Sequence, residues 1–272
     1  MNKKAIGIFD TGLGGLCAVR ETLKILPGED IIYFGDTGRV PYGSRSYEII
    51  KKYARQDINF LISKDVKIIL IACGTVSSVA LDYLRAEFAD VPILGIIESA
   101  CEKSVKIAEA AGNKKIGIIG TQATISRGAF GQYIHALDNS CEVYGQACPL
   151  FVHLVENGHI KDDDIITKAT AEYYLSELKD LSLSSLILGC THYPMIKNII
   201  GEVIKTELID AGAEAAYKLK QEMIEKNLLN NGETGSLEIF ISDEGMNFSE
   251  IASSFLGFDI KSGISKIDIE NY

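Results

Sequence analysis

The chain has 272 residues, of which 47% are hydrophobic and 24% are charged, and this composition excludes disorder as the main state. Lysine and arginine number 27 against 37 aspartate and glutamate, and the net charge of −10 comes without a basic cluster, so nucleic acid is not expected as a primary partner. The first residues lack the apolar core of a signal peptide, no segment reaches transmembrane length, and the six cysteines contain no Cys-x-x-Cys pair. We therefore expect a cytoplasmic protein with reduced thiols and no membrane association.

Short apolar segments alternate with amphipathic ones along the chain. Segments rich in β-forming residues predict strands over 5–9, 31–34, 67–72, 93–96, 116–119, 186–188, 207–209 and 237–241. Apolar spacing near the helical period predicts helices over 18–26, 47–62, 79–88, 99–111, 164–178, 213–224 and 248–255. This alternation indicates βαβ units, so the sequence predicts an α/β fold with mainly parallel sheets flanked by helices.

Two cysteines occupy nearly duplicate positions in this pattern. Cys73 closes the predicted strand 67–72, Cys190 follows the strand at 186–188, and each has a threonine one or two residues later. Ligands bind at the carboxyl ends of strands in open α/β sheets, so both thiols are expected at a binding edge. A helix N-terminus after each cysteine would favour the thiolate, which predicts two thiols suited to proton transfer or nucleophilic attack.

The duplication extends beyond the cysteines. Gly7, in Ile-Gly-Ile, is echoed by Gly117 at an offset of 110 residues, and Cys73 by Cys190 at an offset of 117. The similar offsets predict two related α/β domains with the active site in the cleft between them. Residues 1–97 plus 211–272 are predicted to form the first domain, with Asp10 and Cys73, and 98–210 the second, with Cys190 and His192. Chance similarity between strand-end motifs is the alternative.

Two glycine-rich loops follow the first two predicted strands. The first, Asp10-Thr-Gly-Leu-Gly-Gly15, opens a helix and can receive an anion on its amides, but Cys17 stands where a dinucleotide fingerprint needs glycine. Asp10 can equally serve as a helix N-cap. The second loop spans 35–43, where Arg39 either binds an anion or braces the loop.

His192 lies two residues from the second thiol. It is expected to tune Cys190 or carry a proton, whereas a zinc site is disfavoured because no second pair has ligand spacing, so we predict no metal. His153 and His159 are interpreted as surface or core histidines rather than ligands. The remaining cysteines are interpreted as small apolar fillers within helices or strands, namely Cys17, Cys101, Cys141 and Cys148.

Five motifs taken together resemble the glutamate racemases of bacterial cell-wall synthesis, in the cofactor-independent aspartate/glutamate racemase superfamily. In chain order they are Asp10-Thr11, Gly35-Asp-Thr-x-Arg-Val-Pro-Tyr-Gly43, Ala72-Cys73-x-Thr75, Gly120-Thr121-x-Ala-Thr124 and Gly189-Cys-Thr-His-Tyr-Pro194. The resemblance implies two α/β domains around a buried glutamate, interconversion of L- and D-glutamate for peptidoglycan, and no cofactor. A homodimer is a further family-level expectation.

The resemblance also implies roles for individual residues. Cys73 would take the Cα proton of D-glutamate and Cys190 that of L-glutamate, with Asp10 and His192 assisting them. Inversion at Cα needs a base on one face and an acid on the other, and two thiols supply both. The implied substrate-binding residues are Asp10, Thr11, Tyr42, Gly43, Gly74, Thr75, Thr121, Thr191 and His192.

One position departs from the family pattern. The family usually has Ala-Cys-Asn-Thr at the first cysteine, and this chain has Gly74 in place of the asparagine. Loss of a buried amide partner can cost about 1–3 kcal/mol, so substrate affinity or specificity is expected to differ.

Three alternatives remain at this point. The first is a racemase or isomerase for aspartate or a similar acid, which the change at Gly74 keeps open. The second is a catalytically silent amino-acid-binding paralogue, although both cysteines are present. The third is a thiol-disulfide enzyme, which the missing Cys-x-x-Cys motif disfavours.

Overall fold

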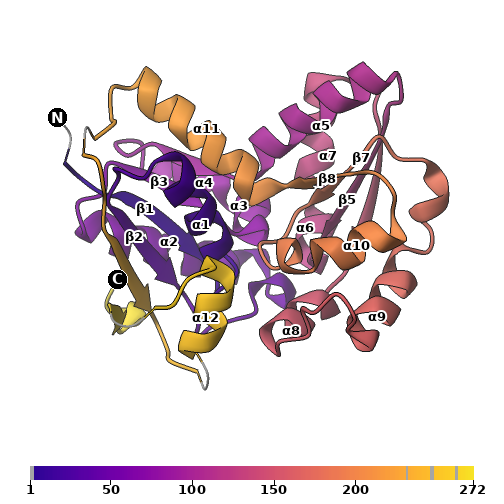
Figure 1. The fold of residues 1–272 in the computed structure, drawn as a ribbon. Coiled ribbons are helices and arrows are strands. Elements are labelled where there is room, and N and C mark those ends of the chain that lie inside the picture. The colour runs from indigo at the N-terminus through magenta and orange to yellow at the C-terminus, as the bar shows by residue number, and fades with distance from the viewer. Residues whose placement is uncertain (1–2, 231, 246–247, 261–262) are drawn as a thin grey trace.

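The strands of the chain form two separate sheets, which lie beside each other in Figure 1. The structure, a computed structural model, describes residues 3–230, 232–245, 248–260 and 263–272. Every strand pair in both sheets is parallel. We call each sheet, with the helices packed on it, a lobe. The predicted α/β class with parallel sheets flanked by helices is confirmed.

The first lobe is built on a six-stranded sheet in the order β10-β9-β2-β1-β3-β4. Its strands are β1 (Ile6–Asp10), β2 (Ile31–Gly35), β3 (Ile68–Ile71), β4 (Ile93–Gly95), β9 (Leu237–Ile241) and β10 (Ile264–Lys266). Its helices are α1 (Leu16–Ile25), α2 (Tyr47–Ser63), α3 (Gly74–Val79), α4 (Leu81–Glu87) and α12 (Phe248–Leu256), with short 3₁₀ turns η1 (Tyr42–Ser44) and η4 (Ile269–Asn271).

The second lobe is built on a four-stranded sheet in the order β6-β5-β7-β8. Its strands are β5 (Lys115–Gly120), β6 (Glu142–Ala147), β7 (Ser185–Leu188) and β8 (Glu207–Asp210). Its helices are α5 (Ile97–Ala111), α6 (Gln122–Arg127), α7 (Ala129–Leu137), α8 (Leu150–Glu156), α9 (Ile165–Leu175) and α10 (Lys197–Val203), with 3₁₀ turns η2 (Lys179–Leu181) and η3 (Tyr193–Ile196).

Both lobes repeat one strand arrangement. The order β2-β1-β3-β4 in the first sheet matches β6-β5-β7-β8 in the second, strand for strand along the chain. Cys73 follows β3 and Cys190 comes two residues after β7, so the two thiols hold equivalent places. The shared topology supports the predicted duplication.

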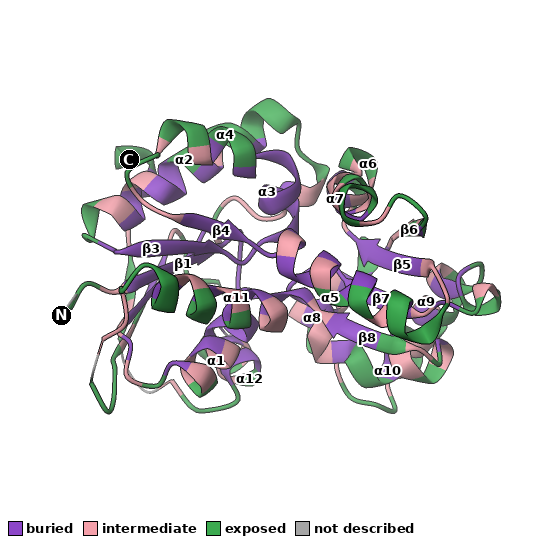
Figure 2. Ribbon diagram, turned by 90° about the horizontal axis from the view of Figure 1, so that it is seen from above, coloured by how far each residue is buried: buried purple, intermediate pink, exposed green. Residues whose placement is uncertain are grey.

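The core of the first lobe has two sides because successive strand residues point to opposite faces. Phe9 packs with residues of α2 and α4, whereas Ile6 and Ile8 pack with residues of α1, α11 (Ala211–Glu225) and α12. Strands covered on both faces need continuous apolar sequence, which is why β3 is fully buried. Figure 2 shows these buried strands between helices whose outer faces are exposed.

The segment after residue 210 returns to the first lobe. α11 packs against both α1 and α5, and β9 then pairs with β2. This pairing supports the proposed domain division, whose boundaries at 97/98 and 210/211 remain predictions. Among the described residues, no helix combines the length and apolar character that crossing a bilayer requires.

Several short elements were not predicted. β6 and β10 lie at sheet edges and have no buried side chains, so they lack the apolar run that marks a buried strand. The helices α3, α6, α7, α8 and α10 have six to nine residues each, too short for a clear helical period.

Candidate active site

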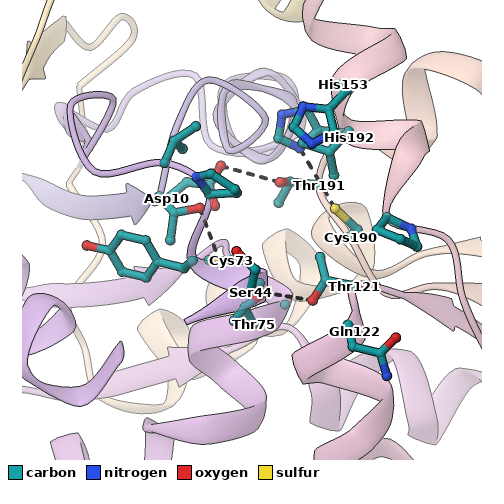
Figure 3. Close-up of a pocket in the computed structure, with 18 of the residues that line it drawn as sticks. Asp10, Ser44, Cys73, Thr75, Thr121, Gln122, His153, Cys190, Thr191 and His192 are labelled. Carbon is teal, nitrogen blue, oxygen red and sulfur yellow. Dashed lines mark hydrogen bonds between the residues drawn. The ribbon is translucent and has the colours of Figure 1, made fainter. Parts of the chain in front are cut away.

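The two strand-end cysteines enter one pocket from different lobes. Cys73 is the N-terminal residue before α3, and Cys190 lies between β7 and η3. Figure 3 shows them reaching the cavity from the purple first lobe and the pink second lobe. The cavity measures about 140 Å³, room for a molecule of amino-acid size.

Every residue predicted to act on or bind the substrate lines this pocket. The lining includes Asp10, Thr11, Tyr42, Gly43, Cys73, Gly74, Thr75, Thr121, Cys190, Thr191 and His192. They come from the carboxyl ends of β1, β3, β5 and β7 and from η1. Parallel topology brings these ends to facing edges of the two sheets, as the sequence pattern predicted.

The Cys73 thiol is buried beside an acidic group. Its Sγ lies 3.7 Å from Thr11 Oγ1. Burial raises the pKa of the Cys73 thiol and the Asp10 carboxylate raises it further, against smaller opposing effects of the Val76 amide and Thr11. The sequence predicted a thiolate favoured by a helix N-terminus; this is wrong for the ligand-free site, because α3 has only six residues and burial dominates.

Asp10 is held in place by both lobes. Its Oδ2 accepts hydrogen bonds from the Gly15 amide at 2.7 Å and from Thr191 Oγ1 at 3.3 Å. The N-cap of α1 is Gly15, so Asp10 is not the helix N-cap that the sequence allowed; it closes the turn before α1 and also lines the pocket. Its Oδ1 is buried and has no hydrogen-bond partner among the described residues. That oxygen is therefore an acceptor available to a cationic ligand.

The Cys190 thiol has a basic neighbour. Its Sγ lies 3.8 Å from His192 Nδ1, and His192 Nε2 lies 3.1 Å from Glu156 Oε1. Burial lowers the pKa of His192, but the interactions with Cys190 and Glu156 outweigh it and raise the pKa to about 10. His192 is thus an imidazolium at neutral pH, set between the Cys190 sulfur and the Glu156 carboxylate. Phe255 of α12 covers its ring edge-on, at 5.7 Å between centroids.

The lobes touch closely around the cavity. Thr75 Oγ1 lies 2.9 Å from Thr121 Oγ1 across the boundary. A Cβ atom at Gly74 would overlap the carbonyl oxygen of Gly189, which is backbone and cannot rotate away. Glycine is therefore required at position 74 for this approach of the lobes, and an asparagine there would force them apart.

The second glycine-rich loop is braced from within. Arg39 donates to Asp36 Oδ2 at 2.6 Å and to Asp57 Oδ1 at 3.1 Å, so it braces the loop and is not placed to bind an anion. The Tyr42 hydroxyl bonds to Asp36 and Asp57 and is buried. Tyr42 therefore lines the pocket while its hydroxyl is engaged by these two carboxyl groups.

Four polar pocket residues were not predicted. Glu156 and His153 lie on α8, Ser44 ends η1 and Gln122 begins α6. A carboxylate three residues after a histidine in an apolar helical segment was the available signal for α8. His153 is exposed, as a surface histidine should be, yet it also lines the cavity.

The other candidate residues lie outside the pocket. His159 pairs with Asp164 at 2.9 Å. Cys17 and Cys101 are buried within helices, whereas Cys141 and Cys148 are buried just before and just after β6 rather than inside an element. In the part of the chain that the structure describes, no three His, Cys, Asp or Glu side chains gather as a metal site.

Comparison with known proteins places this geometry in a family. The Asp/Glu/hydantoin racemase family matches residues 20–219. The chain is 39% identical to the glutamate racemase of Thermoanaerobacter pseudethanolicus over all of both chains, and 42% identical to that of Persephonella marina over 97% of this chain and 98% of that one. The crystal structure of glutamate racemase from Francisella tularensis in complex with D-glutamate has a TM-score of 0.92 and 34% identity, with 100% of both chains covered. The chain therefore belongs to the Asp/Glu/hydantoin racemase family, in which these full-length relatives are glutamate racemases.

Proposed function

We propose that this protein interconverts L- and D-glutamate by cofactor-independent proton transfer at Cα, with Cys73 and Cys190 as the two acid–base groups. The observation that carries the proposal is the entry of two thiols into one small cavity from equivalent strand ends of two lobes. Relatives that share the whole chain length are glutamate racemases. D-glutamate formed in this way would serve peptidoglycan synthesis in the cytoplasm.

Each turnover moves one proton on each face of the substrate. A thiolate takes the Cα proton, and the electron pair left on Cα delocalises into the adjacent carboxylate. The opposite thiol then protonates the other face, so the first sulfur ends as thiol and the second as thiolate. Exchange of one proton with solvent restores the starting state.

The raised pKa of the Cys73 thiol suits one direction of the reaction directly. Because the raised pKa keeps Cys73 protonated, it is ready to act as the acid while Cys190 takes the proton of L-glutamate. The His192 imidazolium, 3.8 Å from Cys190, stabilises negative charge on that sulfur. In the reverse direction, a substrate ammonium group beside Asp10 would favour ionisation of Cys73 by opposing the charge of Asp10.

The remaining lining groups match an amino diacid. Asp10 Oδ1, which has no hydrogen-bond partner among the described residues, suits the ammonium group. The backbone amides at the start of α3 and the threonine hydroxyls suit the two carboxylates; the binding residues we propose are Thr11, Tyr42, Gly43, Gly74, Thr75, Thr121 and Thr191, with Asp10 and His192. These side chains position and polarise the substrate, since the weakly acidic Cα proton needs electrostatic stabilisation as it leaves.

The test is exchange of the Cα proton in heavy water, followed by NMR, with circular dichroism of the same samples to report racemisation. The native protein should exchange and racemise both enantiomers of glutamate. Cys73→Ala and Cys190→Ala should each lower racemisation at least about a hundredfold, because each removes one acid–base group. Cys101→Ala is the matched control, since that thiol is buried outside the pocket and should leave the rate unchanged.

Absence of exchange with glutamate would contradict the proposal. Exchange with aspartate instead would indicate a racemase of different specificity, and binding of glutamate without exchange would indicate a catalytically silent paralogue. A homodimer remains a prediction, which sedimentation of the native protein would test.

A further inference from the structure

The Tyr42 hydroxyl lies between two buried carboxyl groups beneath one wall of the cavity. Asp36 follows β2 and Asp57 lies on α2, and both are 0% exposed. The hydroxyl contacts Asp36 Oδ2 on one side and lies 3.2 Å from Asp57 Oδ2 on the other. Arg39 contacts both groups, at 2.6 Å from Asp36 Oδ2 and 3.1 Å from Asp57 Oδ1.

The number of hydrogen atoms available for hydrogen bonding in this cluster indicates that one carboxyl group is ionised and the other is protonated. A phenol has one hydrogen to donate, and an ionised carboxylate can only accept. Tyr42 can therefore donate to one neighbour, and its contact with the other is a hydrogen bond only when that carboxyl group carries the proton. Asp36 Oδ2 faces both Arg39 and Tyr42 as donors, whereas Asp57 Oδ2 faces Tyr42 alone among the residues that the structure describes.

We propose that Asp57 is a neutral carboxylic acid that donates to Tyr42, and that the chain of hydrogen bonds from Asp57 through Tyr42 to Asp36 and Arg39 positions the substrate-binding loop. In this arrangement Asp36 is the ionised partner of Arg39. Its second oxygen, Oδ1, has no hydrogen-bond partner among the described residues. Asp57, Asp36 and Arg39 are positioning residues, because none of them lines the cavity.

The charges around the cluster agree with this assignment. Arg39 faces Asp36, Asp57 and Glu270, the last on η4 and largely exposed, and its guanidinium lies over the Tyr53 ring of α2 at 4.1 Å. One guanidinium cannot compensate two buried carboxylates and a surface one. Burial, with the charge of Asp36, raises the pKa of Asp57 well above its usual range despite the opposing effects of Arg39 and Tyr42.

The cluster bears directly on the cavity. Residues 40–44 line it, and the regular structure within them is the short turn η1. The position of the loop therefore depends on side-chain contacts, and within the loop the Tyr42 side chain makes such contacts with Asp36 and Asp57. The loop also has little room to move toward the other lobe, since a Cβ atom at Gly43 would lie 2.8 Å from Thr121 Cβ. This inference rests on the proposed function, in which the loop binds substrate.

The first experiment follows thermal unfolding from pH 4 to pH 8 for the native protein and Asp57→Asn. A native Asp57 that keeps its proton has a pKa above the unfolded value of about 3.9. The native state then binds more protons than the unfolded state, so native stability falls relative to Asp57→Asn as pH rises. An ionised Asp57 would give the opposite trend, a growing advantage for the native protein, and would overturn the proposal. Asp65→Asn, at an exposed carboxylate paired with Lys4, is the control for the same substitution.

The second experiment compares substrate kinetics in three variants. Asparagine keeps both contacts of a neutral Asp57, donating to Tyr42 and accepting from Arg39, so Asp57→Asn should rescue what Asp57→Ala loses. Asp57→Ala and Asp36→Asn should raise KM for glutamate about tenfold with a smaller change in kcat, because the loop is displaced while the thiols remain. The assignment would be overturned if Asp57→Asn raised KM as much as Asp57→Ala while Asp36→Asn left KM unchanged. That result would place the proton on Asp36.

The two experiments separate this inference from the proposed function. A native protein without racemase activity would refute the proposed function, while the unfolding series would still report where the proton lies. An active native protein with the wrong pH trend would refute only the assignment to Asp57. The unfolding series also suffices if Asp36→Asn does not fold.

Discussion

Gly74 stands where the two lobes approach most tightly beside Cys73. The sequence shows glycine at position 74, where the family usually has asparagine. From the sequence alone, this change predicted only the loss of a hydrogen-bond partner for the substrate. The structure shows that a Cβ atom there would overlap the Gly189 carbonyl. The glycine therefore allows the short distance between the lobes, and it also removes a side-chain hydrogen-bonding group from the cavity wall.

Gly74→Ala is expected to lower kcat/KM at least about tenfold for both enantiomers, because displacement of reacting groups by about 1 Å can cost a hundredfold. Steady-state racemisation monitored by circular dichroism measures the effect. Gly201→Ala is the control: its Cβ would meet Leu208 at 3.6 Å, an ordinary contact, so the activity should be unchanged. Native kcat/KM in Gly74→Ala would show that the lobes can separate without loss of function.

At the scale of elements, the starts of α3 and α6 meet across the cavity. Thr75 lies in the first turn of α3, and Thr121 is the N-cap of α6, whose hydroxyl accepts from the Thr124 amide at 3.3 Å. The contact between the two hydroxyls joins the lobes above the pocket. The N-termini of two helices, each helix too short to be evident in the sequence, thus face the same cavity.

Thr75→Val should raise KM for glutamate about tenfold, since it removes this contact and a hydroxyl that we propose binds substrate, while keeping the side-chain shape. Loss of the hydrogen bond should also cost about 1 kcal/mol of unfolding free energy. Kinetics and denaturant unfolding measure the two effects. Thr22→Val is the matched control, because that buried hydroxyl donates to the Ala18 carbonyl within α1, outside the pocket, and its loss should leave KM unchanged. A KM equal to the native value in Thr75→Val would argue against a substrate role for this hydroxyl.

At the scale of the whole molecule, the titration of His192 links the stability of the fold to the acid–base chemistry that we propose. Its pKa rises from 6.5 to about 10 on folding, so the native state keeps a proton that the unfolded state releases. The resulting stabilisation is fully present below about pH 6.5 and is lost as pH rises through about 10.

Thermal unfolding should therefore show the native protein losing stability relative to His192→Asn between pH 6.5 and pH 10. Glu156→Gln removes one of the two interactions that raise the pKa and should give an intermediate trend. A difference between the native protein and His192→Asn that does not change with pH would show that His192 is neutral in the folded state.

Much of this protein was predictable from its sequence. Runs such as Ile68–Ile71 must be buried strands, because their apolar residues leave no polar face. Alternation with helices then makes the sheets parallel, and parallel strands bring Asp10, Cys73 and Cys190 to the binding edge. The candidate reactive residues could be predicted because the end of a strand and the presence of a cysteine can both be read from a short stretch of sequence.

Only the tertiary structure decided how these residues act together. Glu156 reaches His192, and Phe255 covers it, through contacts between segments far apart in the chain. The direction of the Cys73 pKa shift depends on burial, and the Tyr42 hydroxyl turns toward Asp36 and Asp57, outcomes that no local pattern contains. Sequence periodicity records which face of an element is apolar; desolvation, charge pairing and the separation of the lobes arise only when distant faces meet.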